Sequence, residues 1–201
     1  MNRLKYILVA LATALSAIPQ SAAGREIKDF FIEMPDELMP MLDRETRKDL
    51  VDICLSGMHT ALPNKWQSTS TMAVVSKNFL SLYEDGEYRS QTSMALLYGA
   101  KDTTICVVRS IFSNADAESA IYFFDRNWRS LKGEKYILLP ELSEFERGGE
   151  RVIDDAQPIG SLRIGIEVDE ERSAHVEIST KTSDRKISYD WNGKRFVRHT
   201  E

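Results

Sequence analysis

The sequence predicts an α+β fold in which N-terminal helices pack on an antiparallel β-meander. Apolar residues between 43 and 58 recur with helical spacing, and from Thr71 onward the apolar period changes to two. The strand-like runs are joined by short turns without helical crossovers, which favours antiparallel neighbours. The strands are expected to form either one core or two related lobes.

Residues 1–23 have the pattern of a secretory signal peptide. Two basic residues precede an apolar run over residues 7–17, and Ser21-Ala22-Ala23 provides small side chains for cleavage before Gly24. An uncleaved anchor needs roughly 20 apolar residues, and Pro19 ends this run too early. We therefore expect a periplasmic or secreted protein without a transmembrane anchor.

Composition and charge narrow the class of partner. The chain has 201 residues, of which 42% are apolar and 28% charged, as in globular proteins. Removal of the signal peptide leaves 24 basic and 31 acidic residues, a net charge of −7. An acidic chain without a Lys/Arg run lacks the footprint of a phosphate-backbone binder, so no nucleic-acid partner is expected.

The first part of the mature chain is expected to be largely helical. Residues 27–32 form either a short strand or the start of a helix, and Met34-Pro35-Asp36 opens a short helix. Asp43 is the predicted N-cap of a longer helix that ends near Gly57. The residues expected on its buried face are Leu50, Val51, Cys54, Leu55 and Met58.

The remaining chain is expected to form strands and hairpins. The Asn192-Gly193 pair predicts a type I′ hairpin, which needs positive φ at both central residues. The expected strands cover residues 79–83, 87–98, 103–112, 119–124, 128–131, 162–168, 174–180, 186–191 and 196–197.

These elements suggest a division of the chain. Residues 24–139 form a helical segment plus an antiparallel sheet, residues 140–160 resemble a linker, and residues 161–201 form a C-terminal meander. The C-terminal meander either stands alone or shares one core with residues 24–139.

The motif search favours a protein without catalytic residues. Neither a Gly-x-Ser-x-Gly elbow nor a His-Glu-x-x-His zinc motif occurs in the sequence. His175 and its acidic neighbours 169–171 are interpreted as a solvated charged turn, so we expect no metal and no cofactor. Cys54 and Cys106 are interpreted as buried small hydrophobes, with a disulfide as the alternative.

Three aromatic residues are the candidate binding residues. Tyr189 and Trp191 share one strand face near the C-terminus, and Trp66 stands alone in a polar segment. Large aromatic side chains anchor partners or line ligand sites. The alternative is that they belong to the core, since aromatic residues dominate cores by area.

The order of several short segments resembles one known family. The segments that carry the resemblance are Lys28-Asp29-Phe30-Phe31, Met34-Pro35, Ile105-Cys106-Val107-Val108, Ile121–Phe124 with Trp128, and Ile187–Val197. They are similar to a family of small secreted proteins, known chiefly from Bacteroidales and catalogued as a domain of unknown function. The resemblance covers nearly the whole mature chain and implies secretion without an assigned activity. Residues 148–158 match least.

From these observations we expect an exported, non-catalytic binding module of the cell envelope or secreted space. Its partner would be an envelope protein or polymer, of a kind that the sequence does not name. Two alternatives remain open. The first is a small-ligand carrier with an apolar cleft between helices and sheet, and the second is an envelope hydrolase that uses acid pairs such as Glu170 and Glu171.

Overall fold

The fold was analysed in a computed structural model. It describes residues 24–87, 89–100, 102–113, 117–145, 161–169, 173–181 and 183–199. The predicted signal peptide and most of the predicted linker lie outside these residues.

Two α-helices form a layer at the start of the described chain. Helix α1 spans Ile27–Ile32, and helix α2 spans Arg44–Leu55, with a 3-10 turn over Asp36–Leu38 between them. Asp43 caps α2 as predicted, because its carboxylate accepts a hydrogen bond from the Thr46 backbone N–H at 2.9 Å. Residues 27–32 therefore take the helical alternative.

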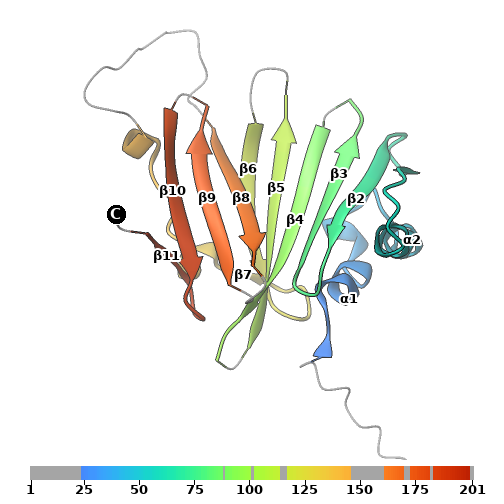
Figure 1. The fold of residues 1–201 in the computed structure, drawn as a ribbon, viewed down its shortest axis with the longest axis horizontal. Coiled ribbons are helices and arrows are strands. Elements are labelled where there is room, and N and C mark those ends of the chain that lie inside the picture. The colour runs from blue at the N-terminus through green and yellow to red at the C-terminus, as the bar shows by residue number, and fades with distance from the viewer. Residues whose placement is uncertain are drawn as a thin grey trace, which may run out of the picture.

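The strands form two antiparallel sheets, which confirms the predicted α+β class. The larger sheet has seven strands that neighbour one another in chain order (Figure 1), namely β1 (Leu62–Pro63), β2 (Thr69–Val75), β3 (Phe79–Asp85), β4 (Arg89–Tyr98), β5 (Thr103–Phe112), β6 (Ala117–Phe124) and β7 (Ser130–Leu131). The smaller sheet has the order β11-β10-β9-β8, with β8 (Leu162–Val168), β9 (Ala174–Thr180), β10 (Ser183–Trp191) and β11 (Phe196–Arg198).

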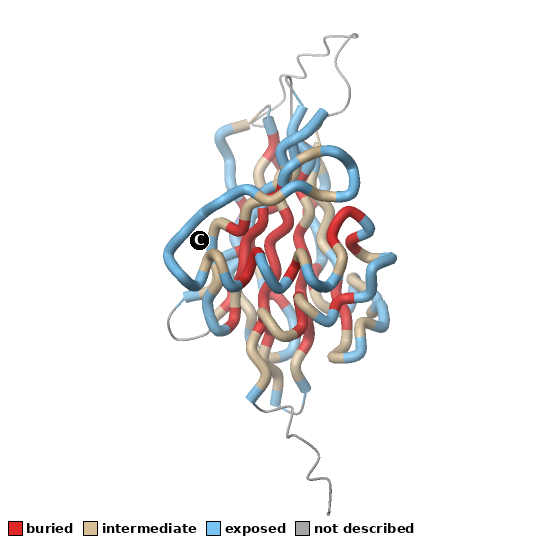
Figure 2. The backbone as a smooth tube through the Cα atoms, turned by 90° about the vertical axis from the view of Figure 1, so that its right-hand side faces the viewer, coloured by how far each residue is buried: buried red, intermediate tan, exposed pale blue. Residues whose placement is uncertain are grey.

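The central strands of the large sheet are buried on both faces. Met94 and Leu96 of β4 pack in one hydrophobic cluster with α1 and α2. The intervening residues, Ala95 and Leu97, pack in a second cluster with the small sheet. Alternate side chains of a strand point to opposite faces, so one strand serves both clusters. The buried segments form a band across the middle of the molecule in Figure 2.

The C-terminal meander shares its core with the large sheet. Cys106 and Phe123 of the large sheet belong to the same cluster as Ile164 and Ile178 of the small sheet. Cys54 packs with the helices on the opposite face. Both cysteines are free, and burial raises the pKa of the Cys106 thiol far above its usual value.

The buried face of α2 differs from the prediction. Leu50 and Val51 are buried as expected and Cys54 is half-buried, but Leu55 lies at the edge of this face and Met58 follows the end of the helix, so both are exposed. The sequence analysis missed Arg47, which is only 1% exposed.

Arg47 is buried because its guanidinium satisfies backbone carbonyl groups that have lost water. It donates hydrogen bonds to the carbonyl oxygens of Leu42 at 2.7 Å, Met34 at 2.6 Å and Ile32 at 3.2 Å. Asp36 adds an ion pair at 3.1 Å from the surface side. Arg47 therefore ties the end of α1 and the following segment to α2.

The turn at Asn192 and Gly193 is present, but its predicted type is wrong. Trp191 pairs with Phe196 and the Asn192 N–H donates to the Arg195 carbonyl oxygen at 3.1 Å, so the two central residues are Gly193 and Lys194 and not Asn192 and Gly193. Only Gly193 has positive φ, at +87°, while the Asn192 side chain accepts hydrogen bonds from the N–H groups of residues 194 and 195. An asparagine side chain thus replaces the second left-handed residue of a type I′ turn.

Within the described part of the chain, no helix is both long and apolar enough to cross a membrane.

Candidate binding groove

Four cross-strand rows of side chains line the helix-facing side of the large sheet. Two rows lie under the helices and are almost wholly apolar, Leu96–Ile105–Phe124 and Leu80–Met94–Val107–Tyr122. The third row, Leu82–Thr92–Arg109–Ala120, is mixed, and the fourth, Glu84–Ser90–Ile111–Glu118, is largely polar. We call the fourth row the floor row, because the helices do not cover it.

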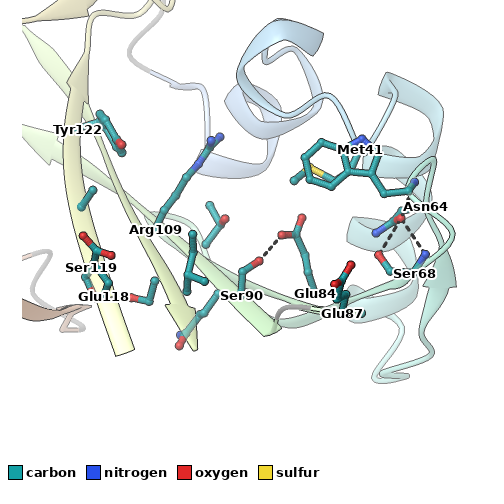
Figure 3. A pocket seen from close by; sticks show the side chains of 17 residues that line it. Met41, Asn64, Ser68, Glu84, Glu87, Ser90, Arg109, Glu118, Ser119 and Tyr122 are labelled. Carbon is teal, nitrogen blue, oxygen red and sulfur yellow. Dashed lines mark hydrogen bonds between the residues drawn. The ribbon is translucent and has the colours of Figure 1, made fainter. Parts of the chain in front are cut away.

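The floor row and most of the third row form the floor of a groove with a volume of about 850 Å³. Figure 3 shows the groove between the β3–β6 strands and the 64–68 segment. Its size falls in the range of about 300–1,000 Å³ typical of ligand sites. A smaller cavity of about 480 Å³ lies at the same strand ends and shares Gln91, Ser110 and Ser119 with the groove.

One wall of the groove is a loop that Asn64 organises. The Asn64 side-chain oxygen accepts hydrogen bonds from the Trp66 N–H at 3.0 Å and the Ser68 hydroxyl at 2.9 Å. Gln67 takes a left-handed conformation with φ +57° to close the loop. These bonds hold Trp66 at the rim of the groove, where 62% of its surface is exposed.

Arg109 connects the floor of the groove to the helix layer. Its guanidinium extends from β5 and donates a hydrogen bond to the Leu38 carbonyl oxygen. Met41, which is buried, and Tyr122, which is half exposed, complete the side near the helices. Arg109 thereby links β5 to the 3-10 turn between the two helices.

The described lining residues carry more negative than positive charge. Glu84, Glu87 and Glu118 face one cation, Arg109. The Ser90 hydroxyl donates a hydrogen bond to one oxygen of the Glu84 carboxylate. The other oxygen, Oε1, is buried and accepts no hydrogen bond from any residue that the structure describes. A buried carboxylate oxygen without a partner is costly, and a cation close to Glu84 would offset part of that cost.

The three aromatic residues that the sequence offered as binding candidates lie in different surroundings. Trp66 lies at the groove rim. Tyr189 is 3% exposed, its hydroxyl donates to the Leu138 carbonyl oxygen at 3.0 Å, and burial raises the pKa of its phenol. Trp191 is half-buried and donates through Nε1 to the Tyr98 carbonyl oxygen at 2.8 Å. Tyr189 thus belongs to the core and also lines a separate cavity of about 310 Å³, while Trp191 packs at the margin of the core.

A second polar cluster lies on the small sheet, away from the groove. The Asp190 carboxylate bonds to the rings of His175 and His199, and Asp169 lies 3.4 Å from the other ring nitrogen of His175. No group of three or more His, Cys, Asp or Glu residues suited to a metal ion occurs among the described residues. The acidic neighbours 170 and 171 lie outside that part of the chain.

Sequence reasoning missed the floor row, although a signal was present. Along residues 79–85 the helix-facing positions change from leucine at 80 and 82 to glutamate at 84. A similar change occurs in β4, where Met94 gives way to Thr92 and Ser90. These changes fall in one row only in the register that the four strands β3 to β6 adopt, and the pattern of a single strand does not reveal that register.

Comparison with solved structures supports the fold. A domain of an uncharacterized protein from Porphyromonas gingivalis W83 superposes with a TM-score of 0.68. The match covers 87% of this chain and 100% of that domain at 21% identity, so it shows a shared fold. No curated protein matches this chain.

The family comparison covers both helices and the whole of the larger sheet. The model of a family described as "Protein of unknown function (DUF3256)" matches residues 19–157, which include both helices and strands β1–β7. This range is more than half of the chain. The expected resemblance to a family of unknown function is confirmed at that level, and the chain belongs to the DUF3256 family.

Proposed function

We propose that this protein is an exported, non-catalytic binding module of the cell envelope or secreted space, and that it binds its ligand in the groove. The observation that carries the proposal is the groove itself, a concavity of about 850 Å³ with an exposed tryptophan at its rim. Its floor belongs to a sheet buried on both faces elsewhere, so the site is preformed and rigid. Preformed concave sites with a few oriented polar groups are typical of ligand binding.

The lining argues against a carrier of wholly apolar ligands. The volume meets the expectation for a carrier, but Glu84, Glu87 and Glu118 line the groove together with Ser90. An apolar ligand would displace water from these groups without replacing its hydrogen bonds, at a cost of several kcal/mol. The hydrolase alternative has no comparable support, because Glu170 and Glu171 lie outside the described residues.

Export and binding are tested separately. Export predicts that the mature protein begins at Gly24 when the N-terminus of the fractionated protein is sequenced. Full-length chain retained in the cytosol would contradict export. The support for export is the pattern of residues 1–23.

Binding is tested by NMR on the chain from Gly24 onward. Amide signals of the floor row are followed during titration with a short lysine-containing peptide, with chitotriose and with palmitate. Binding in the groove predicts saturable shifts at Ser90 and Ile111 with the peptide or the oligosaccharide. Stoichiometric binding of palmitate alone would support the carrier alternative. Floor-row signals that stay in place with all three probes would contradict the proposed function.

A further inference from the structure

We infer that the groove binds an extended peptide segment with a central apolar residue and a cationic residue two positions before it and two positions after it. This inference rests on the proposed function and names the ligand class of that site. It is carried by the spacing, charge and burial of the floor row, defined above as Glu84, Ser90, Ile111 and Glu118.

The separation of the two end carboxylates of the floor row fits an extended peptide. Glu84 and Glu118 occupy the two ends of the floor row and are separated by three strand-to-strand steps. Neighbouring strands lie roughly 4.8 Å apart, which places the two backbones about 14 Å apart. An extended peptide rises about 3.3 Å per residue, so its residues i and i+4 span a similar distance. Side chains i, i+2 and i+4 also point to the same side.

The second argument is the order of chemistry along the row. A carboxylate stands at each end, while the 55% exposed side chain of Ile111 lies between them beside Ser90. A ligand that presents a cation at each end and an apolar group between them therefore complements the two carboxylates and Ile111. Glu87 adds a third carboxylate at the Glu84 end of the groove.

The third argument is the state of Glu84. Its Oε1 atom is buried and has no hydrogen-bond partner among the described residues, while its other oxygen already accepts from Ser90. An ammonium or guanidinium group bound beside Glu84 would compensate the charge of this carboxylate, whose Oε1 atom is itself buried from the groove. Trp66 lines the same groove and offers an aromatic face, which attracts cations.

Arg109 does not oppose a cationic ligand at the floor. It belongs to the neighbouring row, and its guanidinium is directed at the Leu38 carbonyl oxygen above the sheet. Its remaining donors suit a backbone carbonyl group of a bound peptide. A neutral oligosaccharide would use the same hydroxyl and carboxylate groups but would leave the negative charge uncompensated.

The test compares three peptides of matched length by NMR titration of the chain from Gly24. The first, acetyl-Lys-Ser-Leu-Ser-Lys-amide, has the proposed i, i+2, i+4 pattern. The second, acetyl-Lys-Ser-Leu-Lys-Ser-amide, has the same composition with one lysine on the opposite face. The third, acetyl-Gln-Ser-Leu-Ser-Gln-amide, is neutral. We expect the first to bind with floor-row shifts and about tenfold more tightly than the neutral peptide, since two partly desolvated ion pairs are lost.

Protein variants locate the effect. Glu84→Gln and Glu118→Gln should each weaken binding of the first peptide about threefold or more, and raising the salt concentration to ~0.3 M should reduce the difference between peptides. Glu167→Gln is the matched control, because it removes one carboxylate from an exposed position of the small sheet. Glu118 is itself exposed, so its substitution does not disturb folding.

The outcomes distinguish this inference from the proposed function. Two results would overturn the cationic ligand class and leave groove binding intact. In the first, the neutral peptide binds as tightly as the first peptide; in the second, chitotriose binds in the groove and none of the three peptides does. Binding that is unchanged by both floor-row variants would also overturn it. Floor-row signals that respond to no probe would overturn both.

Discussion

Substitution of Arg47 by alanine should destabilise the protein strongly, although the residue does not line the groove. The change removes the donor from three carbonyl oxygens, those of Ile32, Met34 and Leu42, at distances between 2.6 and 3.2 Å. Hydrogen bonds from charged groups contribute about 1.5–3 kcal/mol each, and deleting one member of a buried charged network costs about 3–5 kcal/mol. We expect a loss of about 4 kcal/mol in the free energy of unfolding. Asp36 is more than half exposed and contributes little of this.

The assay is equilibrium unfolding of the chain from Gly24 by urea and by heat. For a domain of this size, about 4 kcal/mol corresponds to a decrease in Tm of roughly 8–16 °C. Arg44→Ala is the control, since Arg44 lies on the same helix but has an exposed side chain paired only with Glu45. A decrease for Arg47→Ala no larger than that of the control would refute the reasoning that buried carbonyl groups depend on this guanidinium.

Three further predictions concern the cap, the C-terminal turn and the histidine cluster. Hydrogen bonds from the first turn of α2 hold the pKa of Asp43 below its usual 3.8, so its stabilising effect is present above that pH and lost as the pH falls further; Asp43→Asn should flatten the dependence of Tm on pH in this acid range. Gly193→Val should lower Tm because φ is +87°, whereas Gly165→Val, at a strand position without positive φ, should lower it much less; equal effects would contradict the turn geometry. Burial opposes the charged form of His175, but hydrogen bonds with nearby carboxylates outweigh it and raise the pKa of His175 above 6.5. The stabilisation that His175 gains from these carboxylates is therefore present below pH 6.5 and lost as the pH rises through its raised pKa. The variant Asp190→Asn should lower the pKa of His175, measured by NMR titration.

Features set by local chemistry were predictable from the sequence. The Asp43 cap depends on one side chain and the N–H three residues later. The bounds of β8 and β9 follow from a period of two, and those of β5 follow from a continuous apolar run. Features that depend on distant segments were not. Arg47 is buried because carbonyl groups of the segment 32–42 accept its hydrogen bonds, which the spacing of residues within α2 does not show.

The groove could not be predicted from the sequence either, because it also depends on distant segments. Trp66 was identified because a tryptophan in a polar segment is unusual. Glu84, Ser90, Ile111 and Glu118 come from four strands, and each residue alone is unremarkable for a strand end. Only the register of β3 to β6 places them in one row, and register is set by pairing across the whole sheet.

The position of the floor row has a consequence for how this fold can diversify. The apolar rows of the same strands are constrained from both sides, because a substitution there opens a cavity in one of two clusters. The floor row lies beyond both clusters, so its side chains can change without repacking either one. Under the proposed function, relatives with the same strands can therefore acquire different ligands through substitutions in a single row, at little expense in folding stability.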